Sequence, residues 1–363
     1  MNVRGCWHRE THRPNGKDQT RRNEMMKDMI TTSKLAVLEI CAGAGGQSVG
    51  LEQAGFGHSL AVEIDNDAAA TLTLNRPGWK IHHGDVREVS GKDYKGIDLL
   101  AGGVPCPPFS IAGKQLGADD ERDLFPEALR LVEEAKPSAV MLENVRGLAS
   151  ARFSTYRQSI LDALGNLGYE ADWQLFYSSE FGVPQLRPRF ILVAVKRRFH
   201  KKFDWPAAHG TPPTVGKVLL PLMKSGGWAG AEAWAARANG VAPTVVGGSK
   251  KHGGADLGPT RAKAAWLQLG VDGKGIANEV PGPETPPDHV PRLTNEMVAR
   301  VQGFPLDWQF SGKKTSVYRQ IGNAFPPPVA AAIGTSIATA LGVKAPVNKQ
   351  FEESVERHLR AVS

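Results

Sequence analysis

One cysteine of this 363-residue chain is placed for chemistry rather than for packing. Cys106 stands in the run Gly-Gly-Val-Pro-Cys-Pro-Pro-Phe-Ser (102–110), directly after an apolar stretch that predicts a buried strand. Each proline ring fixes its own φ, so the three prolines around the thiol stiffen the loop and set its direction. Open α/β sheets place their sites where strands end. The pattern indicates a nucleophilic thiol, and the ordinary alternative is a buried, inert cysteine.

Three more charged side chains stand beside predicted strands. Glu143 lies at the end of the apolar run 138–144, where a carboxyl group could donate a proton to a bound ring or accept one from it. Arg187 and Arg189 precede the apolar run 190–195. At i and i+2 of an extended segment they are expected to point the same way and to reach one acidic or carbonyl-bearing target. The alternative for both arginines is an exposed strand edge.

A second group of residues predicts a nucleoside site. The turn Cys41-Ala42-Gly43-Ala44-Gly45-Gly46 follows the first apolar run, and such a turn lets backbone N–H groups approach a ligand closely. Glu63 ends the second run, where its carboxylate could accept hydrogen bonds from ribose hydroxyls. Asp85 lies at the end of the third predicted strand–helix unit and could accept a hydrogen bond from an adenine amino group. These positions do not say which nucleoside is bound, because similar turns serve NAD, FAD or packing alone.

The elements that must position these groups alternate between strand and helix. Buried strands are predicted at 35–40, 59–64, 97–103, 138–144 and 190–195, and helices at 48–54, 68–75, 125–135 and 156–167. Near-continuous apolar strands alternating with helices are typical of a parallel sheet covered on both faces. The fold class is therefore α/β and Rossmann-like. Helical periodicity returns at 295–301 and 328–341, whereas the Gly-, Pro- and Trp-rich stretch between predicts short strands and loops.

Charge is unevenly distributed along the chain. The formal net charge of +7 separates into +3 for residues 1–33, −6 for 34–195, +6 for 196–290 and +4 for 291–363. A basic block that coincides with a change in composition points to a nucleic-acid partner. No apolar run is long enough to span a membrane, the N-terminal residues lack the apolar core of a signal peptide, and three cysteines cannot form a disulfide framework. A reducing cytoplasm is the expected compartment.

The ordered set of motifs closely resembles the DNA (cytosine-5-)-methyltransferases, above all the bacterial enzymes of restriction-modification systems. The resemblance rests on the Ala-Gly-x-Gly-Gly turn, Pro-Cys-x-x-Phe-Ser, Glu-Asn-Val (143–145) and Gln-x-Arg-x-Arg (185–189). Near the C-terminus, Gln-Gly-Phe-Pro (302–305) and Arg-Gln-Ile-Gly-Asn-Ala (319–324) complete it. The match runs from about residue 35 to 342, apart from a variable insert. Each element is weak alone, but six in the family's order are specific.

This resemblance implies a covalent mechanism for Cys106. In the family the thiolate adds to C6 of a flipped-out cytosine, which makes C5 nucleophilic toward the methyl group of S-adenosylmethionine. Loss of the C5 proton and elimination of the thiol then restore the ring. Glu143 would hold N3 and the exocyclic amino group, and Arg187 and Arg189 would line the pocket, the second near cytosine O2.

The resemblance also assigns the cofactor residues. The methionine part of S-adenosylmethionine would lie near Ala42, Gly43, Gly45 and Gly46, while Glu63 holds the ribose and Asp85 the adenine. Asn323 should line the pocket as the C-terminal helix packs back beside the first strand. The chain departs from many relatives at Cys41, where they carry Phe against the adenine ring. Ile64 could cover the base instead.

The variable insert is expected to recognise DNA. We predict a smaller, mostly β target-recognition domain at 203–290, between a catalytic domain at 34–200 and its completion at 291–345, with a mobile basic arm at 1–33 and a tail at 346–363. Phosphate or base contacts are assigned to Thr244, Lys250, Lys251, Arg261 and Lys263. Trp205, Trp228, Trp234 and Trp266 are expected to form the core of this domain.

The expected partner is double-stranded DNA, bound by a monomer without a metal ion or a membrane, at the bacterial nucleoid. A restriction endonuclease, where one exists, would act independently. Two alternatives stay open: a tRNA cytosine-5 methyltransferase and a catalytically silent DNA-binding homologue. The roughly 90-residue basic insert disfavours the first, and the intact Cys106 and Glu143 disfavour the second. An NAD(P) oxidoreductase would leave the Pro-Cys loop unexplained.

Overall fold

The computed structural model describes residues 35–105, 123–208, 210–248 and 254–343. The predicted arm 1–33, the tail 346–363 and Cys106 lie outside these ranges. The strands are β1 (Leu35–Ile40), β2 (Phe56–Glu63), β3 (Ile81–His83), β4 (Leu99–Gly102), β5 (Ala139–Val145), β6 (Tyr169–Tyr177) and β7 (Pro188–Lys196). The helices are α2 (Gly46–Gln53), α3 (Asn66–Asn75), α4 (Phe125–Ala135), α5 (Ser154–Asn166), α6 (Arg197–His200), α7 (Val215–Lys224), α8 (Ala231–Arg237), α9 (Thr260–Gln268), α10 (Asn295–Val301), α11 (Lys314–Asn323) and α12 (Pro327–Ala340).

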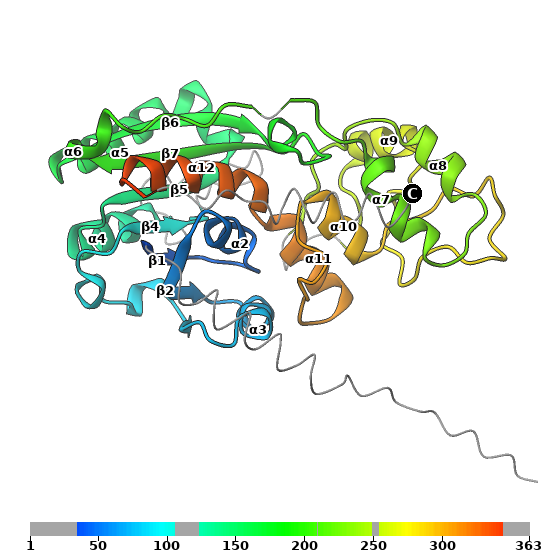
Figure 1. Ribbon diagram of the computed structural model, residues 1–363, viewed down its shortest axis with the longest axis horizontal. Helices are drawn as coiled ribbons and strands as arrows, with labels where there is room; N and C mark the ends of the chain where they lie inside the picture. The colour runs from blue at the N-terminus through cyan, green and yellow to red at the C-terminus, as the bar shows by residue number, and fades with distance from the viewer. Residues whose placement is uncertain (1–34, 106–122, 209, 249–253, 344–363) are drawn as a thin grey trace, which may run out of the picture.

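The seven strands form one sheet in the order β3-β2-β1-β4-β5-β7-β6 (Figure 1). The first five run parallel, which confirms the predicted Rossmann-like α/β fold. The expectation of a wholly parallel sheet is wrong, because β7 pairs antiparallel with both β5 and β6. A single short turn of 3₁₀-helix, Ser178–Phe181, and the following residues join β6 to β7, and so short a connection allows only an antiparallel pair.

Two helical layers cover the sheet, as predicted from its apolar strands. Along β1, Leu38 and Ile40 face a cluster built with α4 and α5. Leu35 and Val37 face the opposite cluster, which includes α12 and Leu51 of α2. This alternation along one strand places α2 and α12 on the same face, where they pack against each other.

The prediction of a mostly β small domain at 203–290 is wrong. This segment forms α7, α8 and α9, and its described residues contribute no strand to a named sheet. In α7, Val215, Leu219 and Met223 are fully buried at intervals of four residues, which is the spacing of one helix face. The glycine- and proline-rich stretches that suggested short strands lie between these helices as loops.

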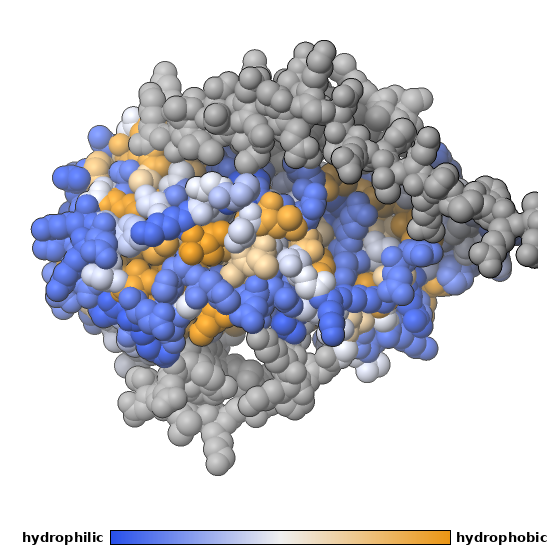
Figure 2. Space-filling model, turned by 90° about the horizontal axis from the view of Figure 1, so that it is seen from below, coloured by the Kyte–Doolittle hydropathy of each residue, from blue (hydrophilic) through white to orange (hydrophobic). Residues whose placement is uncertain are grey.

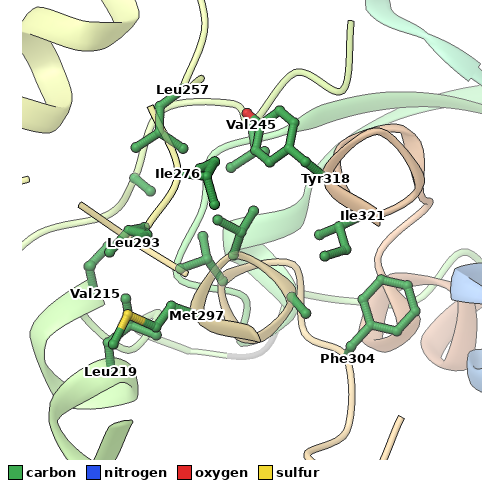
Figure 3. Close-up of a cluster of buried hydrophobic side chains, with 14 of the residues drawn as sticks. Val215, Leu219, Val245, Leu257, Ile276, Leu293, Met297, Phe304, Tyr318 and Ile321 are labelled. Atoms are coloured by element: carbon green, nitrogen blue, oxygen red, sulfur yellow. The ribbon is translucent and has the colours of Figure 1, made fainter. Parts of the chain in front are cut away.

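The small segment shares its core with the C-terminal part of the chain (Figure 3). Val215 and Leu219 of α7 pack in one cluster with Met297 of α10 and Ile321 of α11. Of the tryptophans predicted for this core, Trp228, Trp234 and Trp266 belong to it. Trp205 does not: it packs against the catalytic sheet, with its ring centroid 5.5 Å from that of Phe176 and 5.2 Å from that of Phe203. The domain limits at residues 203 and 290 therefore stay predictions, since one core crosses the second limit.

The surface offers no apolar belt on the face that Figure 2 shows, where hydrophobic residues stand in small groups between hydrophilic ones. Within the described ranges, no helix is long and apolar enough to cross a membrane.

Candidate active site

A pocket of about 930 Å³ opens at the carboxyl edge of the parallel strands. The glycine-rich turn after β1, the ends of β2, β4 and β5, the segment after β3 and the C-terminal end of α11 all contribute to its wall. Eight of the predicted cofactor residues line it: Cys41, Ala42, Gly43, Gly46, Glu63, Ile64, Asp85 and Asn323. Glu143, from the predicted catalytic group, also lines it. Gly45, Arg187 and Arg189 are not part of this wall.

The glycine-rich turn is fixed by packing from behind. Gly45 has a left-handed φ of +87° and serves as the N-cap of α2. A Cβ there would lie 2.5 Å from Cζ2 of Trp308, whose indole N–H donates to the carbonyl of Ala44 at 3.0 Å. A Cβ on Gly46 would lie 2.3 Å from the carbonyl oxygen of Phe325. Because Gly45 and Gly46 carry no side chain, Trp308 and Phe325 can pack directly against the turn.

Cys41 occupies a strained position in this wall. Its φ of +51° is unusual for a residue with a side chain. Burial raises the pKa of its thiol to about 12, and the nearby charges of Glu63 and Asp85 act in the same direction. At neutral pH Cys41 is therefore a neutral thiol, a lining group rather than a nucleophile.

Glu63 connects the first two strand ends. Its carboxylate accepts the backbone N–H of Gly43 and that of Asp65, each at 2.7 Å. Burial raises the pKa of Glu63 above its ordinary value, although the two backbone bonds act against the shift. Asp65 in turn is the N-cap of α3, accepting from the N–H groups of Asp67 and Ala68. Glu63 thereby holds the glycine-rich turn and the start of α3 in one arrangement.

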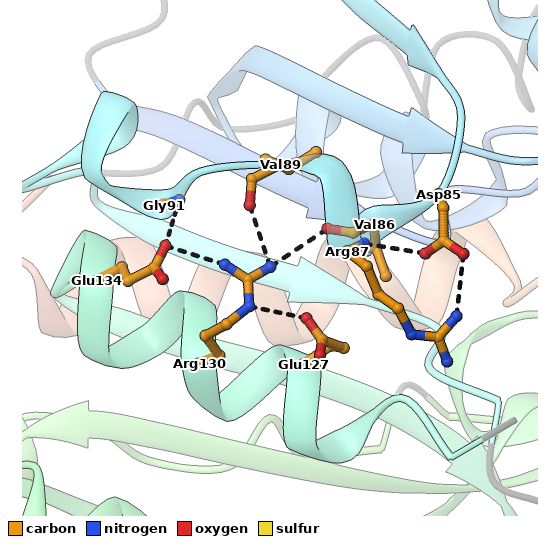
Figure 4. Close-up of polar contacts among 8 residues, drawn as sticks. All are labelled: Asp85, Val86, Arg87, Val89, Gly91, Glu127, Arg130 and Glu134. Carbon is orange, nitrogen blue, oxygen red and sulfur yellow. Dashed lines mark hydrogen bonds and ion pairs between the residues drawn. The ribbon is translucent and has the colours of Figure 1, made fainter. Parts of the chain in front are cut away.

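Asp85 lies on a loop that α4 holds in place (Figure 4). One of its oxygens accepts the backbone N–H of Arg87 at 2.9 Å, and the other pairs with the Arg87 guanidinium at 3.0 Å. From α4, Arg130 donates to the carbonyls of Val86 and Val89 at 3.4 and 3.1 Å. Arg130 is itself held by Glu127 at 2.8 Å and Glu134 at 3.0 Å. The guanidinium of Arg130 therefore fixes the backbone that presents Asp85 and Arg87 to the pocket.

At the other end of the pocket, Glu143 and Arg189 form a buried ion pair. Nε of Arg189 lies 2.5 Å from Oε1 of Glu143, and both side chains are about nine-tenths buried. The two residues come from neighbouring antiparallel strands, β5 and β7. Burial lowers the pKa of Arg189, while the charge of Glu143 opposes the shift. Glu143 thus presents its carboxylate to the pocket, while Arg189 holds that carboxylate from behind the wall.

The prediction that Arg187 and Arg189 reach one target is wrong. Arg187 is fully buried and donates to the carbonyls of Val245, Gly322 and Ala324 at 2.7 to 2.8 Å. Its φ of +25° lies outside the extended region, and β7 begins only at the next residue. Side chains at i and i+2 share a face only within a regular strand, and this condition fails here. Burial lowers the pKa of Arg187 well below its ordinary value, and the charge of Arg189 adds to the shift.

The stem of the Cys106 loop is well anchored, although Cys106 lies outside the described residues. On one side, the Asn144 side chain donates to the carbonyl of Val104 at 2.9 Å. The backbone N–H of Leu124 donates to the carbonyl of Pro105 at 3.3 Å, which joins the two ends of the loop. Pro105 and Leu124 both line the pocket. Gly103, which precedes this stem, lies close to Glu143, since a Cβ on it would lie 3.3 Å from Oε2 of that residue.

The sequence analysis missed part of the wall. Arg319 and Gln320 line the pocket from α11, and Arg87 and Phe325 complete it. Arg319 lies 3.7 Å from Asp65, and Gln320 accepts a hydrogen bond from Thr71 at 2.7 Å. The signal was available, since both residues belong to the quoted motif at 319–324.

Of the predicted DNA-contacting residues, Thr244, Arg261 and Lys263 are described, and none of these three lines the pocket. Arg261 is exposed on α9, and Thr244 is half-buried. Lys263 pairs with Asp256 at 2.7 Å, so its charge is balanced within the protein. Lys250 and Lys251 lie outside the described residues. Their contacts with DNA stay predictions.

The described ranges contain no group of three or more His, Cys, Asp or Glu residues that could hold a metal ion.

The fold and pocket define an α/β protein with a large pocket at the carboxyl ends of its parallel strands, and comparison with known families identifies it. The sequence model of the C-5 cytosine-specific DNA methylase family matches residues 35–339, and the chain belongs to that family. It is a DNA (cytosine-5) methyltransferase.

Relatives agree with this assignment. The type II methyltransferase M.NaeI of Lentzea aerocolonigenes is 60% identical over 314 residues, which cover 85% of this chain and 76% of that one. M.NgoMIV of Neisseria gonorrhoeae is 52% identical over 308 residues, covering 84% and 97% of the two chains. A crystal structure of a Spodoptera frugiperda Dnmt2 variant shares the fold, with a TM-score of 0.60 at 18% identity over 84% of this chain and 99% of that one.

Proposed function

We propose that the chain transfers a methyl group from S-adenosylmethionine to C5 of a cytosine in a specific duplex DNA sequence, as the modification enzyme of a restriction-modification system. The observation that carries this proposal is that one pocket is lined both by the predicted cofactor residues and by the predicted catalytic residue Glu143. The glycine-rich turn with Glu63 forms one part of its wall. Glu143, which Arg189 holds from behind, and Pro105 form another part.

The residues of the pocket fit S-adenosylmethionine. Its volume of about 930 Å³ lies within the usual range for cofactor sites. Ribose hydroxyls find an acceptor in Glu63, the adenine amino group finds one in Asp85, and Ile64, which is 66% exposed, offers an apolar surface for the base. The exposed amide of Asn323 and the first N–H groups of α2 are available to the methionine part of the cofactor. When bound, the cofactor supplies an electrophilic methyl group on a sulfonium centre.

The other end of the pocket fits a cytosine ring. Glu143 can accept a hydrogen bond from the exocyclic amino group and share a proton with N3, while Arg189 can donate to O2. Because the two side chains are paired at 2.5 Å, they present acceptor and donor in fixed relation. The thiolate of Cys106 adds to C6, and a proton held at N3 by Glu143 neutralises charge as C5 becomes nucleophilic. Departure of the C5 proton and of the thiol restores aromaticity.

The particular biological role is supported by the relatives, which are type II methyltransferases. Bisulfite sequencing of DNA from cells expressing the chain tests the proposal in one experiment. Conversion-resistant cytosines in one short sequence are expected, and their absence with folded protein present would overturn the proposal.

Variants of the reactive loop test the mechanism. Cys106→Ala should abolish transfer of label from methyl-labelled S-adenosylmethionine to duplex DNA, whereas Cys6→Ala should retain it. The wild-type protein should form a denaturant-resistant adduct with a duplex that carries 5-fluorocytosine at the site, because the fluorine blocks the final elimination. Retained transfer by Cys106→Ala would refute the covalent route. Transfer to tRNA but not to duplex DNA would favour the RNA alternative.

We further infer that the protein acts as a monomer, without a metal ion, on chromosomal DNA, and independently of any endonuclease. Full activity in EDTA and a sedimentation coefficient of a 39.1 kDa particle are the expected results. Loss of activity in EDTA or a dimeric mass would contradict these points.

A further inference from the structure

The segment 244–247, which belongs to the predicted recognition region, lies directly against the last turn of α11. The contact is between backbones. A Cβ on Gly322 would lie 2.4 Å from both Cα and N of Gly247. Gly322 cannot carry a side chain without displacing the backbone of Gly247, so the absence of a side chain at position 322 allows the segment to approach the helix this closely.

Gly247 also contacts a residue of the pocket wall. A Cβ on Gly247 would lie 2.5 Å from Oδ1 of Asn323 and 2.6 Å from the carbonyl oxygen of Arg319. Asn323 lines the pocket and is exposed to it. Its side chain has no hydrogen-bond partner among the residues that the structure describes. Packing against Gly247, rather than a hydrogen bond, therefore limits where the Asn323 amide can lie.

The segment cannot easily move away from Asn323. The backbone N–H of Val245 donates to Gln185 at 2.7 Å, and the Val245 carbonyl accepts from Arg187 at 2.7 Å. Arg187 also donates to the carbonyls on either side of Asn323, those of Gly322 and Ala324, at 2.8 and 2.7 Å. Because one guanidinium holds both the segment and the helix end, an added methyl group at position 247 displaces the Asn323 side chain and also strains the contact with the Arg319 carbonyl.

We propose that Gly247 is a positioning residue for the methyl-transfer site: through its contact with Asn323 it sets one wall of the cofactor pocket from within the recognition region. This inference rests on the proposed function, in which that pocket binds S-adenosylmethionine. Gly247 touches neither cofactor nor cytosine itself, and it acts only through Asn323.

Calorimetric titration with S-adenosylhomocysteine, in the absence of DNA, measures the effect on the full chain. Gly247→Ala should raise the dissociation constant at least about tenfold, which corresponds to about 1.4 kcal/mol. Gly254→Ala is the matched control, because a Cβ there meets no atom of the described residues within 4 Å and the residue lies in the same region. It should bind as the wild type does. An unchanged dissociation constant for Gly247→Ala would overturn the proposal.

A double-mutant cycle separates positioning from a general structural effect. If Gly247 acts through Asn323, the pair Gly247→Ala with Asn323→Ala should lose less affinity than the sum of the two single losses. The clash with the amide is gone in the pair, and only the contact with the Arg319 carbonyl remains. Losses that add in the pair would refute the proposal. If Gly247→Ala alone does not fold, the double variant provides the test. If the double variant does not fold either, the clash is with the backbone rather than with the Asn323 side chain, and the proposed role of Asn323 is overturned.

The two proposals fail in different ways. Absence of binding by the wild-type protein would count against the proposed function. Wild-type binding that Gly247→Ala leaves unchanged would count only against the role of Gly247.

Discussion

Replacing Arg187 by Met should destabilise the fold before it affects chemistry. The wild-type guanidinium is fully buried and donates to three backbone carbonyls, two of them at the C-terminal end of α11. A helix end leaves carbonyls without intrahelical partners, and a buried cation satisfies them here. Hydrogen bonds from a charged donor contribute about 1.5 kcal/mol each at the low end. Removing the buried charge recovers some desolvation energy, so the net loss is about 3 kcal/mol.

Thermal unfolding of the ligand-free protein is the direct assay. A loss of 3 kcal/mol lowers the unfolding temperature by about 4 °C in a chain of 363 residues, because the unfolding entropy is about 2.1 cal/mol/K per residue. Arg197→Met is the control: that side chain is 63% exposed and pairs with Glu170 at 3.3 Å, so the change should be under about 1 kcal/mol. Arg187→Lys, which keeps the charge but cannot reach three carbonyls together, should fall between the two. A wild-type unfolding temperature for Arg187→Met combined with lost methyl transfer would refute this reasoning and return Arg187 to the reaction.

Three further outcomes follow from the pocket wall. Gly45→Ala places a Cβ 2.5 Å from Trp308 at a left-handed φ, so it should cost about 1–3 kcal/mol; an unfolding temperature within a degree of wild type would contradict this. Cys41, with its pKa raised to about 12 from 9.0, should react with iodoacetamide at pH 8 about a thousandfold more slowly in the native protein than in urea, and faster as pH rises; mass spectrometry of its peptide showing equal rates would count against the burial argument. Arg130→Met should weaken S-adenosylhomocysteine binding by about threefold to tenfold, because it releases the backbone that presents Asp85; calorimetry showing wild-type affinity would exclude that role.

Local sequence patterns predicted the strands that are buried on both faces of the sheet. The strands β1, β2, β4, β5 and β7 appeared as continuous apolar runs because helices cover both sides of them. By contrast, β6 was missed: it is the last strand of the sheet, and every second side chain along most of it is exposed. Its sequence, YEADWQLFY, mixes charged and aromatic residues, so it resembles neither a buried strand nor a helix.

The prediction for the small segment, residues 203–290, was wrong for a different reason. Its composition, rich in Gly, Pro and Trp, describes the loops, whereas three short helices hold its core together with α10 and α11. A core shared with residues far along the chain leaves little signal in any one window. Helix α11 was missed as an element although its motif was quoted, because the motif indicated function without indicating conformation.

The two arginines of Gln-x-Arg-x-Arg show that residue type alone does not determine the role of a side chain. Both are buried and two residues apart, yet Arg189 pairs with an acidic pocket residue and Arg187 binds only carbonyls. The difference arises at the backbone: Arg189 lies within β7, opposite Val145 of β5, while Arg187 precedes the strand at a φ of +25°. That turn lets Arg187 bind both the segment containing Val245 and the end of α11. The two arginines thus have different structural tasks: Arg189 holds the carboxylate of Glu143 at the pocket, and Arg187 joins the segment containing Val245 to the end of α11.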